Sequence, residues 1–464
     1  MSRPQNTSGA SVPKPVADLV LRGGPVHTLA GSGPGPGPAS GTALAVRSGR
    51  VLRVGADADV RDLIGPATEV VDLKGRAVIP GINDAHLHAT WLGALWPDTL
   101  FGDHAAPGPG PQRPLCTPAE RRAAILKAGD LLARLGITSY TEPGLGPGED
   151  AGLAGAFGMS VVEQYRNLAA EGLLRARVTA LWLYGELDGP STLDDYRAGL
   201  AALGGRDPDP AMLNFAGVKI FADGIPPMRS AYTHHCYADG SHAELLVAGE
   251  NDTEREQNLT TMIVEAHHAG LQVGVHATGD RAIELMLDAV ERARAERDLD
   301  LRHYVIHGDM VNPAQLQRMA RLGVGLSTQA GIAVRTASMV DAVLGAQRAG
   351  STWPLRETLD VGIPLCLTSD APVLPPDWRR EIAAADEWMG PADNPRDRVE
   401  TLLRCYTVHP ARQDGAETWK GTLAEGMVAD LCVLAADPLT VTAAELPGVD
   451  VDMTVLGGRV VHER

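Results

Sequence analysis

The stretch NLTTMIVEAHHAGLQVGVHATGDRAIELMLDAVERARAE, residues 258–296, decides how the middle of this chain folds. Apolar residues recur every three or four positions at its two ends, which is typical of amphipathic helices, and the run LQVGVHA between them is typical of a buried strand. The same alternation occurs roughly eight times over about 330 residues and predicts parallel strands joined by crossover helices. We expect a closed (β/α)8 TIM barrel rather than an open sheet, because the chain has no glycine-rich dinucleotide-binding loop.

Short runs rich in Val and Leu lie near both ends of the chain, where they alternate or cluster as strands do. They occupy residues 17–29, 42–55, 68–81, 429–437 and 451–463. Strands at both termini around a long middle predict a small β-sandwich domain built from both ends of the chain. The expected order is a disordered stretch at 1–16, sandwich strands at 17–78, the barrel at 79–412 and the rest of the sandwich at 413–464.

The composition argues against several classes of protein. The 464 residues include 41 Lys and Arg against 58 Asp and Glu, and this net charge of −17 disfavours binding to nucleic acids and anionic membranes. We find no apolar run of about 18 residues that could span a bilayer, and no apolar segment typical of a signal peptide near the start. The five cysteines are scattered without a Cys-x-x-Cys pair, which fits a reducing compartment. We therefore expect a cytoplasmic protein that binds neither nucleic acid nor membranes.

The segment Asp84-Ala85-His86-Leu87-His88 carries the sharpest local signal for chemistry. Residues two apart on a strand point to one face, so His86 and His88 can present both imidazoles to one metal ion. An isolated His-x-His is also common on solvated loops. The pair by itself therefore leaves both interpretations open.

Four more polar residues lie in or at the end of predicted strands. Lys219 lies inside AGVKIFADG, His276 ends LQVGVH, His307 ends HYVIH and Asp370 ends IPLCLTSD. Each has a structural alternative: a buried paired lysine, a core histidine or a helix-capping aspartate. In a barrel of parallel strands, however, the carboxyl ends of all strands meet at one mouth, where active sites lie. Together with the two histidines above, these residues predict a metal site.

Six motifs follow one another along the chain in an order that is specific when they are taken together. They are PGINDAHLH (80–88), VKIFADG (218–224), HATGD (276–280), HGD (307–309), TSDAPV (368–373) and GTLAEGMVADLCVL (421–434). This set resembles the metal-dependent amidohydrolase superfamily, and within it the YtcJ-like branch that includes the N-substituted formamide deformylases. The resemblance covers nearly the whole chain from about residue 17 onward and implies a TIM barrel flanked by a β-sandwich from both termini.

The resemblance also implies a set of metal ligands. His86, His88 and Asp370 would hold a first ion, and His276 and His307 would hold a second. Lys219 would bridge the two if its amine were carboxylated by CO2, because an ammonium group cannot bind a metal whereas a carbamate offers two oxygens. Nitrogen and carboxylate donors make zinc, Zn2+, the leading candidate, with other divalent metals as alternatives. The spacing leaves open whether one or two ions are bound.

These residues suggest a mechanism. A bound cation lowers the pKa of its water toward ~7 and polarises a substrate carbonyl. Asp370 would take the proton of the attacking water and pass it to the leaving nitrogen. We expect hydrolysis of a C–N bond in a small amide or N-substituted formamide. The alternatives are a metal-dependent barrel with other chemistry (carbamate or ester hydrolysis, hydration or isomerisation) and a catalytically silent binding protein, against which the complete ligand set argues. The resemblance also implies a homodimer.

The chain departs from its relatives near the predicted site. Glu142 stands in GITSYTEPG where relatives more often have Asp, and Ile306 stands where a Glu commonly precedes the histidine. The loop DGIPPMRSA, residues 223–231, has two prolines and a Met in place of small residues. This loop follows Lys219 and is expected to line the mouth of the barrel. We therefore expect a substrate that differs from those of characterised relatives.

Other residues near the predicted mouth are candidates for contact with the substrate. Arg229 would hold a substrate carboxylate or pair with an acidic side chain, and Gln329 would donate to the substrate carbonyl. Trp91 and Trp96 would wall an apolar pocket or simply pack the loop that follows His88. Asp280 would cap the helix after His276 or support that histidine from behind the metal.

Overall fold

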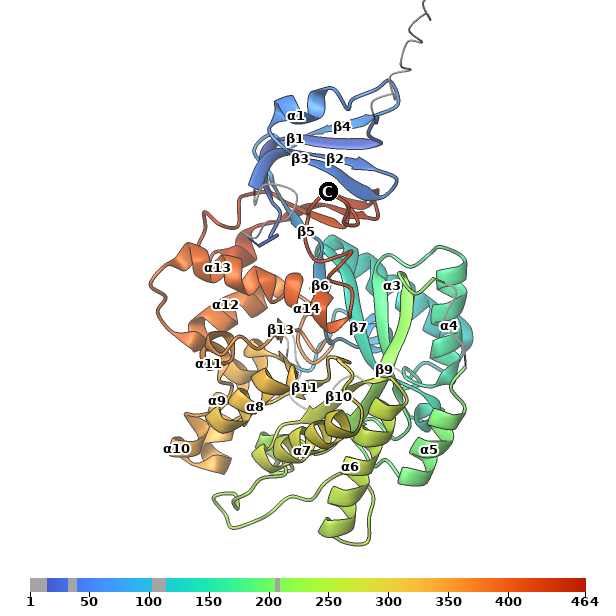
Figure 1. Ribbon diagram of the computed structural model, residues 1–464, viewed down its shortest axis with the longest axis vertical. Coiled ribbons are helices and arrows are strands. Elements are labelled where there is room, and N and C mark those ends of the chain that lie inside the picture. Colours follow the sequence, from blue (N-terminus) through green and yellow to red (C-terminus); the bar gives the residue numbers. More distant parts are fainter. Residues whose placement is uncertain (1–14, 32–39, 102–113, 205–208) are drawn as a thin grey trace, which may run out of the picture.

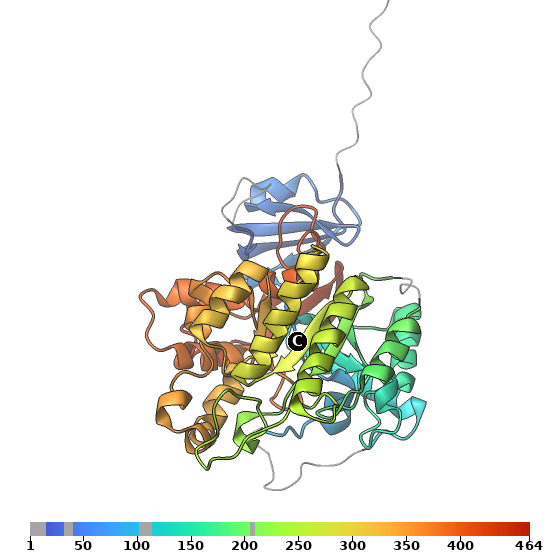
Figure 2. The ribbon, with the colours of Figure 1, turned by 60° about the horizontal axis from the view of Figure 1, so that its bottom comes forward.

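The middle of the chain forms one sheet of eight parallel strands that curls into a barrel, with helices on its outer face (Figures 1 and 2). The computed structural model describes residues 15–31, 40–101, 114–204 and 209–464. The barrel strands follow one another in chain order, which confirms the predicted TIM barrel. They are β6 (Ile82–Asp84), β7 (Ile137–Leu145), β8 (Arg177–Leu183), β9 (Leu213–Phe221), β10 (Gln272–Ala277), β11 (Tyr304–His307), β12 (Gly325–Thr328) and β13 (Leu365–Leu367).

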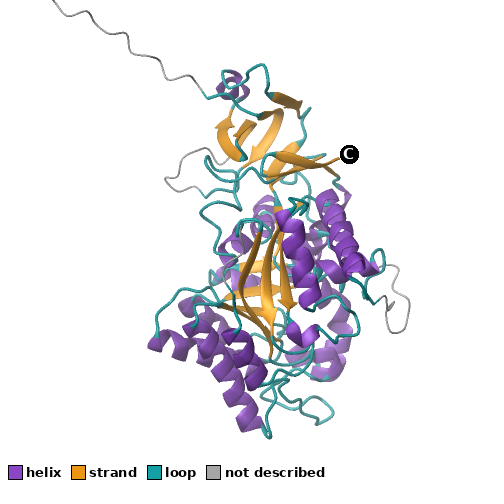
Figure 3. Ribbon diagram, turned by 90° about the vertical axis from the view of Figure 1, so that its right-hand side faces the viewer, coloured by secondary structure: helices purple, strands orange, loops and turns teal. Residues whose placement is uncertain are grey.

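Helices surround these strands, and most of them bury apolar side chains against the barrel (Figure 3). They are α2 (Ala89–Leu95), α3 (Pro118–Arg134), α4 (Met159–Ala170), α5 (Leu193–Ala201), α6 (Asp252–His268), α7 (Asp280–Glu296), α8 (Pro313–Leu322), α9 (Ala330–Leu344), α10 (Ala346–Ala349), α11 (Leu355–Asp360), α12 (Trp378–Met389), α13 (Pro395–Arg404) and α14 (Val408–Gln413). The helix predicted at the carboxyl end of the stretch 258–296 spans Asp280–Glu296 in the structure. Capping residues define both ends of α8. Asn312 is its N-cap, and Gly323 ends the helix in a left-handed conformation.

The first and last barrel strands join at the mouth of the barrel. Beyond the carboxyl ends of β6 and β13, the Asp370 amide donates to the His86 carbonyl at 2.9 Å and the His88 amide donates to the Ala371 carbonyl at 2.7 Å. These two bonds close the ring of strands. They also tie together three of the residues that the sequence predicts as metal ligands.

Within β6 and β13 themselves, a separate piece of chain bridges the two strands. The Leu367 amide donates to the Cys405 carbonyl at 3.2 Å, and the Asn83 amide donates to the Tyr406 carbonyl at 2.8 Å. Cys405 and Tyr406 lie between α13 and α14 and are fully buried. The barrel is therefore completed by this bridging segment between β6 and β13 and by direct backbone hydrogen bonds at its mouth.

The two chain termini together form a second, mixed sheet beside the barrel (Figure 1). Its strands are β1 (Leu19–His27), β2 (Ser40–Arg47), β3 (Arg50–Gly55), β4 (Glu69–Asp72), β5 (Ala77–Pro80), β14 (Leu431–Leu434), β15 (Val451–Leu456) and β16 (Arg459–Glu463), and α1 (Asp57–Arg61) packs on one side. β5 and β14 pair antiparallel, with Val78 opposite Val433, and both contribute to one apolar cluster. The prediction of a small β domain built from both ends is confirmed.

Several of the predicted terminal strands are in fact two strands separated by a tight turn. The turns lie at Ser48–Gly49, Lys74–Gly75 and Gly457–Gly458, and both residues of each have positive φ. Consecutive positive φ values favour glycine and give a two-residue turn that reverses or sharply bends the chain. The alternation of Val and Leu continues across these turns, which is why the sequence pattern joins the strands.

Part of the predicted organisation is not covered by this structure. Residues 1–14 of the predicted disordered stretch lie outside the described residues. The proposed domain boundaries after residues 78 and 412 stay predictions. Among the described residues, no helix combines the length and the apolar character that crossing a membrane requires.

A buried pair of histidines links α6 to the base of the barrel. The Nε2 of His267 lies 2.6 Å from the Arg297 carbonyl and must donate to it, so its Nδ1 accepts from His303 Nε2 at 2.8 Å. The Nδ1 of His303 then accepts the Val273 amide at 2.9 Å. All four ring nitrogens are satisfied only if both imidazoles are neutral. Burial accordingly lowers the pKa of His303 to about 3.

We predict that this pair makes the protein lose stability in acid. Because the folded His303 has a pKa of about 3 against 6.5 in the unfolded chain, its contribution is complete above pH 6.5 and is lost as the pH falls toward 3. The loss from this group is about 1.4 kcal/mol per pH unit. His303→Gln should flatten the dependence of urea unfolding on pH in this range, whereas His235→Gln on the surface should not. An unchanged slope in the His303 variant would contradict the assignment.

Candidate metal centre

Six side chains predicted as metal ligands come from five strands or strand ends of the barrel. Each is at most 8 % exposed, so the site is shielded from bulk water. His86 and His88 follow β6, Lys219 lies in β9, His276 lies in β10, His307 ends β11 and Asp370 follows β13. The structure therefore brings all six to the barrel mouth, as the sequence predicts for their positions. Their role as ligands stays a prediction.

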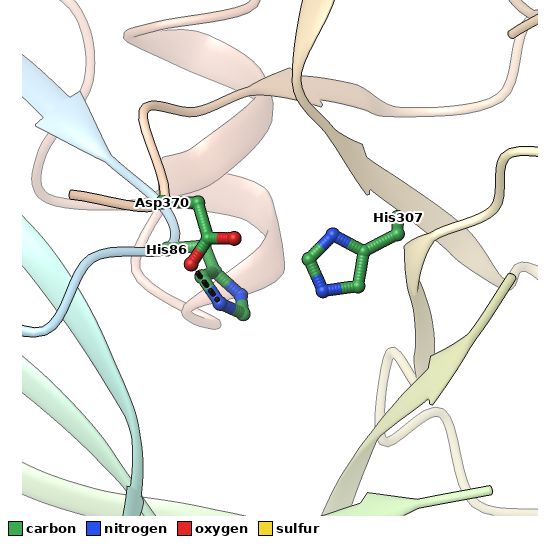
Figure 4. Close-up of side chains that lie close together, drawn as sticks. All are labelled: His86, His307 and Asp370. Carbon is green, nitrogen blue, oxygen red and sulfur yellow. Dashed lines mark ion pairs between the residues drawn. The ribbon is translucent and has the colours of Figure 1, made fainter. Parts of the chain in front are cut away.

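His86, His307 and Asp370 form the tightest group (Figure 4). Their potential ligand atoms all lie within 4.8 Å of one another. The Nε2 of His86 is 3.1 Å from Asp370 Oδ1, and the Nε2 of His88 is 3.6 Å from the same oxygen. The ring of His276 lies 4.4 Å from that of His307, measured between centroids. Four imidazoles and a carboxylate thus share one small volume.

Two of these residues have unusual backbone conformations. His307 has φ of 69° and Asp370 has φ of 52°, both in the left-handed region. Such conformations are uncommon for residues other than glycine and tend to occur at functional sites. The turn at the end of β11 and the turn after β13 therefore hold these side chains in place at some cost in backbone energy.

Hydrogen bonds to neighbouring groups determine which nitrogen of each imidazole faces the centre. Nδ1 of His88 lies 3.2 Å from Glu142 Oε1, and Nδ1 of His307 lies 2.8 Å from Gln329 Oε1. The Nε2 of His276 donates to the Gly224 carbonyl at 3.2 Å. In each ring the other nitrogen remains available for a metal, which is the arrangement that metal-binding histidines show.

The donor set fits a divalent metal ion. The Nδ1 atoms of His86 and His276 are buried without a hydrogen-bond partner among the described residues. Burial lowers the pKa of both imidazoles well below the usual range, and it lowers that of His307 to about 3. A neutral imidazole is the form that binds metal. Unpartnered, neutral nitrogens next to a carboxylate match the nitrogen and oxygen donors that zinc prefers.

Lys219 lies among these side chains with its ammonium group buried. Its Nζ is 4.4 Å from the centroid of the Phe221 ring. Burial lowers the pKa of Lys219 to about 7, while the carboxylates of Asp370 and Asp188 act in the opposite direction. A lysine whose amine is neutral near pH 7 can react with CO2, which fits the carbamate that the sequence resemblance implies.

Glu142 supports the centre from behind His88. Besides His88, its carboxylate accepts the Ala89 amide at 2.7 Å and the Tyr165 hydroxyl at 3.0 Å. It is fully buried. The sequence shows Glu142 only as a departure from relatives, because a contact between residues 54 positions apart leaves no local pattern.

Asp223 is a second supporting residue that the sequence analysis did not single out. It accepts the backbone amides of Tyr232, Thr278 and Gly279 at 2.8, 2.9 and 2.8 Å. These bonds join the turn after His276 to the loop after Lys219. The sequence feature that points to Asp223 is its position directly after the apolar strand that carries Lys219.

Of the two tryptophans predicted to contact substrate, Trp91 packs against a residue of the cluster. The ring of Trp91 is 6.3 Å from that of His88 and 5.8 Å from that of Phe157, between centroids. Trp96 is the C-cap residue that follows α2, and its carbonyl accepts a hydrogen bond from Lys127. Trp91 is therefore beside the candidate centre. Substrate contact by either tryptophan stays a prediction.

Two further side chains that were predicted to contact the substrate have partners within the protein itself. Arg229 is exposed and forms an ion pair with Asp239 at 3.0 Å, so of its two alternatives the structure shows pairing with an acid. Gln329 accepts from His307 and donates to Thr368 Oγ1 at 2.7 Å, which makes it a neighbour of a candidate ligand.

Asp280 was expected to cap α7 or to support His276. The N-cap of α7 is Gly279, with no capping side chain, because the chain enters the helix one residue earlier than expected. The carboxylate of Asp280 instead accepts the backbone amide of His234 at 3.0 Å.

We predict that Glu142→Gln weakens metal binding by roughly 10–100-fold. The Glu142 carboxylate accepts all three of its hydrogen bonds. In the variant, the side-chain NH2 group of glutamine would place a second donor against one of these three donors. Metal affinity, measured by competition with a chromogenic chelator, checks this. Tyr165→Phe is the control, because it removes one donor and leaves the contact with His88. A folded Glu142→Gln protein with unchanged affinity would show that Glu142 does not orient His88.

The amino-acid sequence of this chain is similar to the sequences of two named proteins. YtcJ of Bacillus subtilis, named as an amidohydrolase, is 29% identical over 260 residues, which are 54% of this chain and 48% of that protein. The match thus spans about half the length of that relative. The N-substituted formamide deformylase of Arthrobacter pascens is 25% identical over 91% of this chain and 95% of its own. These two relatives confirm the resemblance to the YtcJ-like branch.

Solved structures and a family model agree with these relatives. A metal-dependent hydrolase from Pyrococcus horikoshii has the same fold, with a TM-score of 0.70 and 20% identity over 92% of this chain and 99% of that chain. The model of the amidohydrolase family matches residues 99–462. With the parallel barrel, the mixed terminal sheet and the cluster at the barrel mouth, this match shows that the chain belongs to the amidohydrolase family.

Proposed function

We propose that this protein is a zinc-dependent hydrolase that cleaves the C–N bond of a small amide or an N-substituted formamide. The observation that carries the proposal is the buried group of His86, His307 and Asp370, with partnerless imidazole nitrogens beside it. The family and the similarity to a formamide deformylase support the reaction type.

Each residue has a distinct task in this proposal. His86, His88 and Asp370 would hold a first ion, and His276 and His307 would hold a second. Lys219, carboxylated by CO2, would contribute oxygen ligands. When bound, the metal would supply a water of lowered pKa and a Lewis acid for the substrate carbonyl.

Asp370 carries the proton in the proposed reaction. Its carboxylate accepts a proton from the attacking water and donates it to the leaving nitrogen, so that the amine departs in neutral form. The backbone bond from Asp370 to His86 fixes the position of the carboxylate at the barrel mouth. Trp91 and Phe157, next to His88, give the nearby wall an apolar character suited to an uncharged organic group.

We predict that Asp370→Asn lowers kcat by roughly 10²–10⁴-fold, because asparagine cannot accept and pass on the proton. The measurements are amine release from N-benzylformamide and zinc content by elemental analysis of the same sample. Asp298→Asn, at an exposed ion pair with Arg294 on the outside of the barrel, is the matched control and should change neither. Full activity together with full zinc content in the Asp370 variant would remove this residue from the reaction.

We also predict that the zinc content depends on Lys219. Protein purified without chelator in the presence of bicarbonate should contain about two zinc ions per chain. Lys219→Met, which has similar length but cannot be carboxylated, should retain about one ion and remain folded. Protein that binds no zinc after addition of zinc and bicarbonate would contradict the metal centre itself. Two ions in the Lys219 variant would contradict only the bridging carbamate.

A further inference from the structure

A cavity of about 840 Å³ lies where β9, β10 and β11 begin, and the starting points of neighbouring strands explain why it is there. β8 pairs with β9 from Leu213 onward, whereas β10 begins opposite Gly217. Among the described strands, none therefore pairs with residues 213–216 on the β10 side. Asn214, Phe215 and Ala216 of this stretch line the cavity. The register of the strands thus creates the cavity.

This cavity is separate from the candidate metal centre. None of the six predicted metal ligands, all of which the structure describes, is among its lining residues. Lys219 lies four residues beyond Phe215 in β9, and His276 lies four residues beyond Gln272 in β10. At about 3.3 Å per residue, the two regions are roughly 13 Å apart along these strands. A molecule in the cavity would not occupy the metal centre.

Gln413 lines the cavity and has no partner for its side-chain amide. The residue is 6 % exposed, and neither its Nε2 nor its Oε1 has a hydrogen-bond partner among the described residues. Its backbone is held in place, because its carbonyl accepts Gln272 Nε2 at 2.7 Å. The amino-terminal end of a TIM barrel mainly serves stability, yet a buried amide without partners costs stability. A bound molecule that satisfies both atoms would remove this cost.

The charges that line the cavity balance one another. They belong to two arginines and two aspartates, Arg166, Arg302, Asp300 and Asp414. Arg302 forms an ion pair with Glu417 at 2.6 Å, and Asp414 forms one with Lys420 at 2.6 Å. A charged ligand would therefore meet no excess of the opposite charge. This lining favours an uncharged molecule.

Aromatic rings form another part of the lining. The rings of Trp182 and Phe215 are stacked with their centroids 4.2 Å apart, and Trp419 also lines the cavity. The guanidinium carbon of Arg166 lies 5.4 Å from the centroid of the Phe215 ring. Flat aromatic and guanidinium groups favour contact with another flat ring. The lining therefore suits a planar molecule.

We propose that this cavity is a second binding site, which takes an uncharged planar ring with an N–H and a C=O side by side, as in a lactam. Gln413 Nε2 donates to the ring carbonyl and Gln413 Oε1 accepts the ring N–H, so that both buried atoms gain a partner. A carboxylate offers acceptors only and would leave Oε1 without a donor. This site does not depend on the proposed hydrolase reaction.

The test compares 2-quinolinone with N-methyl-2-quinolinone, which has the same rings and carbonyl but no N–H. Isothermal titration calorimetry on protein purified without chelator gives the affinity of each compound. We expect 2-quinolinone to bind about tenfold more tightly, because the methylated compound leaves Gln413 Oε1 unpartnered. Absence of saturable binding of 2-quinolinone, or equal affinity for the two compounds, overturns the inference.

Gln413→Met removes both polar atoms and keeps a side chain of similar length. We expect this variant to bind the two compounds equally, and to be no less stable in thermal unfolding because no side-chain hydrogen bond is lost. Gln347→Met, on the exposed surface of α10, is the matched control and should retain the tenfold difference. A tenfold difference that survives Gln413→Met overturns the inference. If that variant does not fold, the comparison of the two compounds on the native protein still decides.

Because 2-quinolinone is itself an amide, Asp370→Asn shows at which end of the barrel it binds. Binding in the cavity should be unchanged in this variant. Affinity that falls in Asp370→Asn and persists in Gln413→Met would place the compound at the metal centre, which overturns this inference and leaves the proposed function intact. Binding that depends on Gln413 supports the inference even if the protein hydrolyses no amide.

Discussion

The closure of the barrel at its mouth is the constraint on which the rest of this structure depends. The two backbone bonds that join His86 and His88 to the turn at Asp370 and Ala371 complete the ring of strands. The same residues supply three of the six candidate ligands. Closing the barrel therefore also assembles this part of the centre, because His86, His88 and Asp370 come together only when the first and last strands meet. This explains why residues nearly 300 positions apart can be held within hydrogen-bond distance.

A second requirement follows from burying so many imidazoles together. Each neutral imidazole needs a hydrogen-bond partner for one ring nitrogen, so that the other nitrogen is free to bind a metal. Here these partners come from different parts of the barrel. Glu142 extends from β7 to His88, Gln329 follows β12 and reaches His307, and the Gly224 carbonyl lies beyond β9 and faces His276. Two strands that carry no candidate ligand, β7 and β12, thus contribute to the centre. In these three cases a strand or the loop after it positions the imidazole of the neighbouring strand.

The fold and the positions of the candidate ligands could be predicted because both leave a local pattern. Helix and strand periods alternate along the chain, and His276, His307 and Asp370 each come at the end of an apolar run. The partners could not be predicted in this way. The contact of Glu142 with His88, the pairing of Arg229 with Asp239 and the bridge through Cys405 depend on chain segments that meet only in three dimensions. The turn at Ser48–Gly49 was missed for a different reason, since an apolar alternation can continue through a hairpin.

The terminal sheet has a consequence for how the chain is made. β5 ends at Pro80 and its partner β14 begins at Leu431, so 350 residues separate them. At a synthesis rate of roughly 5–20 residues per second, about 20–70 s pass between the two strands leaving the ribosome. During that time the amino-terminal strands expose an unpaired edge, which other nascent chains could join. Pro80, which has no amide hydrogen to donate, lies at the end of that edge and limits such pairing until the carboxyl terminus arrives.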